Sequence, residues 1–131
     1  MTTSAASSGI AITQIGQIAI NVHDINRAVE FYRDTLELKL LFTAGRLAFF
    51  DCGGVRLMLT PPERAEFDHP ASILYFKVAD IQAAYAHLVE RKVNVEGEPH
   101  VVARMPDHDL WLAEFRDSEG NIMAFMSEVR H

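Results

Sequence analysis

The chain has 131 residues, enough for one ordinary domain whose hydrophobic core needs no disulfide to stabilise it. Apolar residues make up 49% and charged residues 23%, which excludes a wholly disordered chain. Twelve basic and eighteen acidic residues give a net charge of −6 with no basic cluster, so we expect no nucleic-acid partner.

Residues 1–12 are predicted to be a flexible tail, because they are mostly Ser, Thr and Ala. They have neither the basic start nor the apolar run of a secretory signal, and no later run approaches the ~18 apolar residues of a membrane span. The single cysteine, Cys52, excludes an intrachain disulfide and a cysteine-rich zinc module. We therefore expect a cytoplasmic protein with no membrane partner.

The first half of the chain begins with a strand pattern. Ile15–Val22 alternates apolar and polar side chains, which predicts a half-buried strand, and Asp24 stands where a helix N-cap belongs. Apolar residues from Ile25 to Leu36 then recur at helical spacing. Turn residues separate three short strand patterns that follow, at Leu38–Thr43, Leu47–Asp51 and Val55–Thr60.

The second half repeats this order after a linker. Residues 61–70 are polar and contain three prolines, which predicts the linker. Ser72–Val78 alternates like the first strand, Asp80 is a second candidate N-cap, and a second apolar helix stripe runs from Ile81 to Val89. The three strand patterns that follow are Val101–Met105, Leu110–Arg116 and Asn121–Ser127.

The repeated β-α-β-β-β order favours a duplication. Val22–Ile25 and Val78–Ile81 also have the same Val, Asp and Ile at the same spacing, where strand passes into helix in each half. The predicted fold class is α+β: tandem βαβββ repeats form a curved mixed sheet around a cleft, with the helices on the convex side. An α+β protein without duplication is the alternative. The predicted boundaries within a single domain, residues 13–131, are 13–60 for repeat one, 61–70 for the linker and 71–128 for repeat two.

Three stretches carry a resemblance to a known family. Two of them are similar to the family's opening strand, Asp cap and helix: QIAINVHDINRAVEFYRDTLELKL, at residues 17–40, and ILYFKVADIQAAYAHL, at 73–88. FRDSEGNIMAFM, at 115–126, is similar to a turn and final strand, with Ser118 where the family usually has Pro. Together they resemble the vicinal oxygen chelate superfamily, which includes glyoxalases, bleomycin-resistance proteins and extradiol dioxygenases.

This resemblance implies a divalent metal held by four side chains, one from the first and one from the last strand of each repeat. In this sequence the four positions are Gln17, Met58, Ile73 and Ala124. Only the Gln17 amide offers an oxygen, whereas divalent ions need carboxylate, carbonyl or imidazole ligands. We therefore predict no metal and no other cofactor.

Strand alternation predicts which side chains face the cleft. The resulting surface is largely apolar with a few polar groups, which is typical of small-molecule sites. The predicted ligand-binding residues are Asn21, Phe49, Arg56, Met58, Ile73, Tyr75, Lys77, Leu112 and Ala124.

Glu114, Gln17 and His100 are the candidate catalytic residues. A carboxylate among apolar neighbours is partly desolvated, so Glu114 is a candidate general base or an anchor for a ligand amine. The alternative is a structural salt bridge to Arg56, Lys77 or Arg116. A hairpin would also bring His100 toward Asp107 and His108, although short polar residues are expected in a turn in any case.

Three functions remain open. The first is metal-independent binding of a small amphipathic or aromatic molecule, as bleomycin-resistance proteins bind theirs. The second is a lyase or isomerase that uses Glu114, His100 or Gln17. The third is an enzyme, of dioxygenase or related type, with a non-standard metal site built on Gln17, Glu114 and a histidine. The resemblance also implies a homodimer, in which both chains border each cleft.

Overall fold

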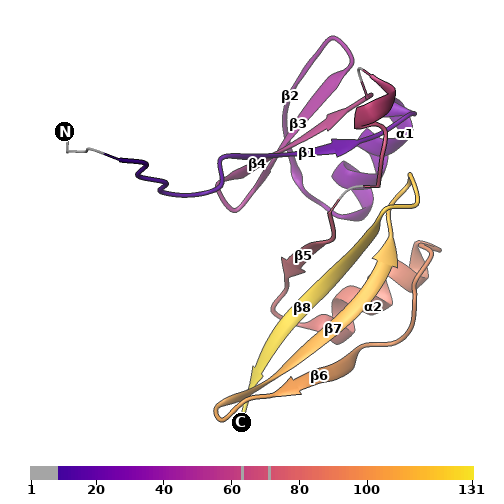
Figure 1. Cartoon of the computed structure of the whole chain (residues 1–131). Helices are drawn as coiled ribbons and strands as arrows, with labels where there is room; N and C mark the ends of the chain where they lie inside the picture. The colour runs from indigo at the N-terminus through magenta and orange to yellow at the C-terminus, as the bar shows by residue number, and fades with distance from the viewer. Residues whose placement is uncertain (1–8, 63, 71) are drawn as a thin grey trace.

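The computed structural model describes residues 9–62, 64–70 and 72–131, and it consists of two modules with the same order of elements (Figure 1). The predicted tail lies outside the described residues at 1–8, and residues 9–16 have no regular secondary structure. Module 1 contains β1 (Gln17–Asn21), α1 (Ile25–Glu30), the π-helical turn η1 (Phe31–Thr35), β2 (Lys39–Ala44), β3 (Leu47–Cys52) and β4 (Val55–Thr60). After the 3-10 turn η2 (Ala65–Phe67), module 2 contains β5 (Leu74–Lys77), α2 (Ile81–Glu90), β6 (His100–Arg104), β7 (His108–Arg116) and β8 (Ile122–Arg130).

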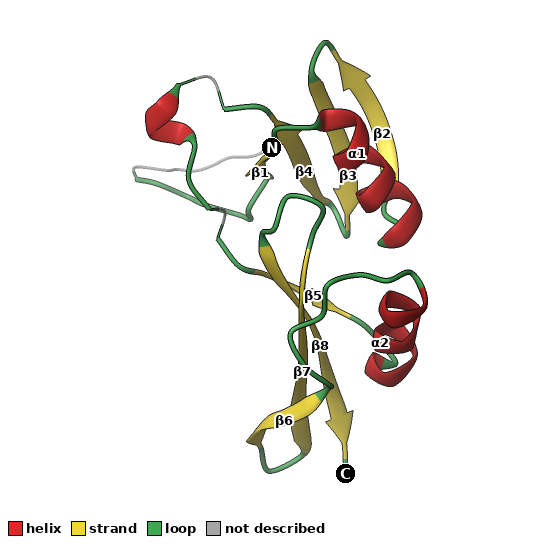
Figure 2. Ribbon diagram, turned by 90° about the vertical axis from the view of Figure 1, so that its right-hand side faces the viewer, coloured by secondary structure: helices red, strands yellow, loops and turns green. Residues whose placement is uncertain are grey.

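The two modules have the same topology, so the predicted tandem βαβββ arrangement is confirmed. The strand orders are β1-β4-β3-β2 and β5-β8-β7-β6. In each sheet the first strand pairs with the last in parallel and the other pairs are antiparallel. The expected curved mixed sheet is thus present as two four-stranded mixed sheets, and both helices lie on the same side of the molecule (Figure 2).

Both helices begin at the predicted aspartates. The Asp24 and Asp80 side chains each accept a hydrogen bond of 3.1 Å from a backbone N–H three residues on. This bond satisfies one of the donors that a helix start leaves unpaired. Helix α1 then widens into η1, where the Leu36 N–H donates to the Phe31 carbonyl at 2.9 Å.

One hydrophobic core joins the modules. It contains the helix-facing side chains of both sheets, among them Ile20, Phe50, Phe115 and Met123, and Tyr32 from η1. These five side chains are at most 2% exposed. Among the described residues, neither sheet has an α-helix on its other face, so the opposite side chains of the strands form two largely uncovered surfaces.

A buried hydrogen bond fastens the turn between β7 and β8 to module 1. The Tyr32 hydroxyl donates to Asp117 Oδ2 at 2.6 Å, and Asp117 is 6% exposed. The other Asp117 oxygen accepts the N–H groups of Glu119 and Asn121, each at 2.8 Å. Burial, and then the negative charge of Asp117, raise the pKa of the Tyr32 phenol well above its usual range.

The structure extends two strands beyond their predicted bounds and half-buries a histidine of α2. His87 contacts the Thr35 carbonyl at 3.1 Å, because α2 packs against the end of η1. Strands β7 and β8 are longer than predicted, since their pairing continues through charged residues to His108 and Arg130.

In the described part of the chain, no helix has the length and apolarity needed to cross a bilayer.

Replacing Tyr32 by Phe should lower the free energy of unfolding by about 1–3 kcal/mol at pH 7, because it removes the buried donor to Asp117. The loss should shrink above pH ~10. There the unfolded phenol releases its proton and the folded one, whose pKa is raised, keeps it, so wild-type stability falls with rising pH. Urea titrations at pH 7 and pH 10.5 measure both effects. Tyr85→Phe is the control, and the same pH dependence in wild type and Tyr32→Phe would contradict the assignment.

Candidate functional site

The uncovered faces of the two sheets carry most of the predicted site residues. In module 1, Gln17 pairs with Arg56, and Met58 pairs with both Ala19 and Phe49. Paired residues of neighbouring strands point to the same side of a sheet, so these side chains share one surface. We call this surface face 1; its residues are Gln17, Ala19, Asn21, Lys39, Phe42, Phe49, Asp51, Arg56, Met58 and Thr60.

The equivalent surface of module 2 is face 2. Ala124 of β8 lies between Tyr75 of β5 and Glu114 of β7. Tyr75 is 50% exposed and the neighbouring Ile73 is 44% exposed, so this surface is partly apolar and open to solvent. The residues of face 2 are Ile73, Tyr75, Lys77, Leu112, Glu114, Ile122, Ala124 and Met126.

Face 1 carries two stacked aromatic rings beside the guanidinium of Arg56. The rings of Phe42 and Phe49 stack with their centroids 4.5 Å apart, and the Arg56 guanidinium carbon lies 5.2 Å from the centroid of Phe49. Arg56 Nε donates to Gln17 Oε1 at 2.7 Å. The Gln17 amide nitrogen is 3.7 Å from the sulfur of Met58. Gln17, predicted to be catalytic, therefore contacts Arg56 and Met58, which are predicted to bind the ligand.

The cations expected beside Glu114 all bind elsewhere. Arg56 contacts Gln17, Lys77 pairs with Glu128 at 3.5 Å, and Arg116 pairs with Glu96 at 2.9 Å. Within the residues that the structure describes, the half-buried Glu114 carboxylate forms no ion pair. The alternative of a structural salt bridge is therefore wrong, because the candidate partners are engaged on other sides.

Ala124 lies on face 2 but has no surface for a ligand. Its exposed fraction is 0%, because larger side chains on the adjacent strands cover its methyl group. Tyr75 and Glu114 are those neighbours, and Leu112 is half-buried on the same strand as Glu114. Of the predicted contacts on face 2, Ile73 and Tyr75 are the exposed apolar ones.

Two adjacent pockets meet at Asn21 and His69, on the edge of face 1. One has a volume of about 580 Å³ and also borders Ile73 and Ile122 of face 2; the other has a volume of about 360 Å³ and borders Ala19 and Met58. The linker forms a wall of both. The linker residues among their linings are Pro61, Pro62, Phe67, Asp68, His69 and Pro70.

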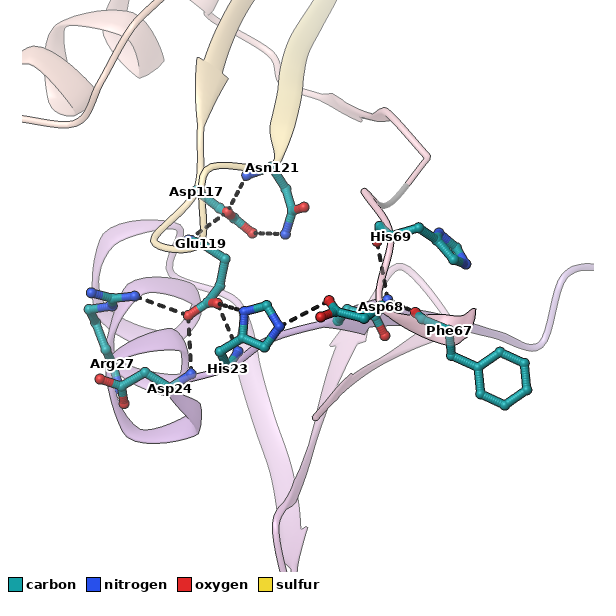
Figure 3. Close-up of polar contacts among 10 residues, drawn as sticks. His23, Asp24, Arg27, Phe67, Asp68, His69, Asp117, Glu119 and Asn121 are labelled. Carbon is teal, nitrogen blue, oxygen red and sulfur yellow. Dashed lines mark hydrogen bonds and ion pairs between the residues drawn. The ribbon is translucent and has the colours of Figure 1, made fainter. Parts of the chain in front are cut away.

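Side chains at the end of β1 hold this wall in place (Figure 3). Asn21 Nδ2 donates to the Phe67 carbonyl and, at 3.2 Å, to the His69 carbonyl. His23 Nε2 lies 3.0 Å from Asp68 Oδ1. The sequence pattern predicts this segment only as a linker and not as a wall of the pockets, although its polar residues Asp68 and His69 were the available signal.

Glu119 ties the same region to module 2 (Figure 3). Its side chain is 6% exposed, and it accepts the His23 N–H at 2.7 Å and the Asp24 N–H at 3.3 Å. It also pairs with Arg27 at 3.2 Å and lies 3.5 Å from His23 Nδ1. The imidazole of His23 thus lies between two carboxylates, one from the linker and one from the β7–β8 turn.

His100 lies apart from the other hairpin residues, so the expectation that the hairpin brings it toward Asp107 and His108 is wrong. It pairs with Leu112 and contacts the Glu98 carbonyl at 3.0 Å, at the far end of β6 from the turn. His108 does contact Asp107, at 2.8 Å. Hydrogen bonds from His108 and then Arg130 hold the pKa of Asp107 below its usual value. The hairpin turn therefore forms an exposed ion-pair cluster without His100.

The residues at the four metal-ligand positions do not fit a divalent ion. The single oxygen donor among them, Gln17 Oε1, already accepts the Arg56 hydrogen bond. Met58 offers a thioether, Ile73 a hydrocarbon, and Ala124 a buried methyl group. Among the described residues, no three His, Cys, Asp or Glu side chains gather around a point that a metal ion could occupy.

Replacing Glu119 by Gln keeps its size but removes the charge that two backbone N–H groups and Arg27 stabilise. We expect the free energy of unfolding to fall by about 1–3 kcal/mol, the usual contribution of hydrogen bonds to a charged group. Guanidinium chloride titration measures this loss. Glu128→Gln, at an exposed pair with Lys77, should change stability by less than about 0.5 kcal/mol. Equal effects of the two substitutions would contradict this role of Glu119.

Known proteins resemble the chain over most of its length. A family model described as the Glyoxalase/Bleomycin resistance protein/Dioxygenase superfamily matches residues 14–125. The YraH protein of Bacillus subtilis is 30% identical over 124 residues, covering 82% of this chain and 92% of that protein. The metallothiol transferase FosB of Staphylococcus epidermidis is 30% identical over 89 residues, and this match covers 64% of each protein. A solved structure of lactoylglutathione lyase from Agrobacterium tumefaciens has a TM-score of 0.69 at 23% identity, covering 88% of this chain and 94% of that one, so it shares the fold.

Proposed function

This chain belongs to the glyoxalase/bleomycin resistance protein/dioxygenase superfamily, and we propose that it binds a small amphipathic or aromatic molecule without a metal ion. The observation that carries this proposal is the occupation of Gln17 Oε1 by Arg56, with no hard donor at Met58, Ile73 and Ala124. The ligand would therefore be held by the faces themselves.

The apolar character of both faces supports this function. Phe42 and Phe49 form a stacked pair on face 1, and Phe42 is 48% exposed. On face 2 the exposed apolar side chains are Ile73 and Tyr75. Phe49 itself is 8% exposed, so the exposed rings of Phe42 and Tyr75 supply the contact area and stacking geometry for a flat apolar molecule.

A homodimer in the cytoplasm would suit this function. Face 1 carries a cation without a carboxylate partner, Arg56, and face 2 carries a carboxylate without a cation partner, Glu114, among the described residues. Two copies related by a two-fold axis would bring face 1 of each chain opposite face 2 of the other and enclose two clefts, each with a cation on one wall and a carboxylate on the other.

An enzyme of the same superfamily is the second candidate function. It is favoured by Glu114, whose half-buried carboxylate has no ion-pair partner among the described residues, with His100 paired to Leu112 on the adjacent strand. Two relatives, the metallothiol transferase and the lactoylglutathione lyase, are named for reactions. A lyase, isomerase or dioxygenase-type reaction would use Glu114, His100 or Gln17. Turnover abolished by Glu114→Gln would favour this candidate, whereas saturable binding without turnover favours the first.

Binding of the neutral fluorescent probe N-phenyl-1-naphthylamine tests the proposed function directly. We expect saturable binding, weakened about 5- to 30-fold by Phe42→Ala or Tyr75→Ala, because each removes a ring worth about 1–2 kcal/mol of contact. Val89→Ala is the matched control, since Val89 is 49% exposed on α2, away from both faces. Absence of saturable binding, or equal weakening by all three substitutions, would contradict the proposal.

Metal content after loading tests the metal-independent part. Purified protein incubated with Ni, Zn, Mn, Fe(II) and Co and then dialysed should retain less than ~0.1 equivalent of each, because a protein site needs a full ligand set to hold its ion. Probe binding should also be unchanged by a chelator. Near one equivalent per chain, lost in Gln17→Ala or Glu114→Ala, would show that a non-standard metal site exists.

A further inference from the structure

We propose that Arg56 binds the carboxylate of the ligand, so that a guanidinium supplies the positive charge of the cleft. The ligand class is then a small amphipathic or aromatic carboxylic acid. This inference rests on the proposed function, because it names the charged end of the molecule that face 1 would bind.

The guanidinium of Arg56 is held in one orientation by two contacts. Its Nε donates to Gln17 Oε1 at 2.7 Å, and its carbon lies 5.2 Å from the centroid of the Phe49 ring. A hydrogen bond at Nε and a ring beneath the guanidinium restrict the rotation of a long, flexible side chain. The side chain is nevertheless exposed at the surface of face 1. Arg56 is therefore preorganised rather than buried.

The two terminal nitrogens of Arg56 remain available. Within the described residues they form no hydrogen bond or ion pair, in contrast to the guanidinium groups of Arg27, Arg104 and Arg116. Terminal guanidinium nitrogens form a planar fork that matches the two oxygens of a carboxylate. Arg56 thus presents an oriented and unused fork on the face that would bind the ligand.

The neighbours of Arg56 decide from which side an anion can approach. Asp51 pairs with Arg56 across the sheet, on the β3 side, and its Oδ1 caps the Gly54 N–H at 3.3 Å instead of binding Arg56. A carboxylate would be repelled on that side. On the β1 side the neighbours are the uncharged Gln17 and Ala19. The free approach is therefore toward β1.

The apolar part of the ligand would then lie over the next pair of residues along the strands. Ala19 and Met58 follow Gln17 and Arg56 by two positions, about 7 Å along the strands at 3.3 Å per residue. These two residues line the pocket of about 360 Å³, together with Phe67 of the linker wall. The carboxylate at Arg56 and the apolar body in this pocket fit one molecule.

The role of Gln17 explains why the positive charge on face 1 comes from the Arg56 side chain and not from a metal ion. It stands at a position where the resemblance implies a metal ligand, but its carbonyl oxygen orients a cation that belongs to the chain itself. A guanidinium stays charged at any physiological pH and, unlike a metal ion, needs no ligand shell. Gln17 is therefore a positioning residue for Arg56 and does not itself contact the carboxylate.

Isothermal titration calorimetry with three matched probes tests this inference: 1-naphthoate, 1-naphthamide and 1-naphthylmethylammonium. Wild type should bind the naphthoate at least tenfold more tightly than the amide, and the ammonium most weakly. Arg56→Gln should abolish the preference for naphthoate, Arg56→Lys should reduce it, and Gln17→Leu should reduce it while amide binding stays unchanged. Unchanged amide binding shows that each variant retains the pocket.

Lys39→Gln is the matched control, because Lys39 pairs with Asp51 in the same row of residues, two strands from Arg56. It removes the same charge and should leave the naphthoate preference within about twofold of wild type. If wild type binds the amide as tightly as the naphthoate, or if Lys39→Gln matches Arg56→Gln, the inference is overturned while the proposed function stands. If none of the three probes binds, both are overturned.

Discussion

The buried hydrogen bond between Tyr32 and Asp117 is the constraint on which the arrangement of the two modules depends. It joins a side chain of the π-helical turn in module 1 to the β7–β8 turn of module 2, inside a shared apolar core. A buried carboxylate without partners would cost several kcal/mol, on the order of the whole margin of stability, so this turn has little freedom to move. Glu119, in the same turn, accepts hydrogen bonds from the backbone N–H groups of His23 and Asp24, just before α1. His23 in turn contacts Asp68, so these contacts fix the linker wall beside the pockets.

The same scaffold leaves each sheet with one uncovered face, and the chemistry of those faces distinguishes this chain. Where the superfamily resemblance implies metal ligands, face 1 has an amide, Gln17, that orients Arg56. Face 2 has Glu114 without a cation partner among the described residues and an alanine, Ala124, covered by its neighbours. A permanent organic cation and an unpaired carboxylate can bind polar ends of a ligand, but neither provides the shell of hard donors that a divalent ion requires.

Much of the fold could be predicted because it depends on local patterns. Alternation of side chains sets which face of a strand is buried, and the Asp24 and Asp80 caps satisfy helix donors within three residues of chain. The linker wall could not be predicted in this way. Asn21 meets Phe67 and His69, and His23 meets Asp68, across some 45 residues of sequence, and no periodicity records such contacts. The sequence likewise could not predict that Lys77 pairs with Glu128 and Arg116 with Glu96, so that neither pairs with Glu114. Several acidic residues were equally good candidate partners for these cations.

The amino-acid sequence by itself determined the repeated βαβββ order, the buried faces of strands and helices, and the residue types at the four metal-ligand positions. These follow from periodicity, capping and side-chain chemistry, which act within a few residues. Tertiary structure alone decided which polar groups are paired. It gave Arg56 an orienting partner in Gln17, left Glu114 without a cation among the described residues, and made the linker a wall of two pockets. The physical reason is that ion pairs and hydrogen bonds depend on distances of about 3 Å between groups far apart in sequence, and only the packed core sets those distances.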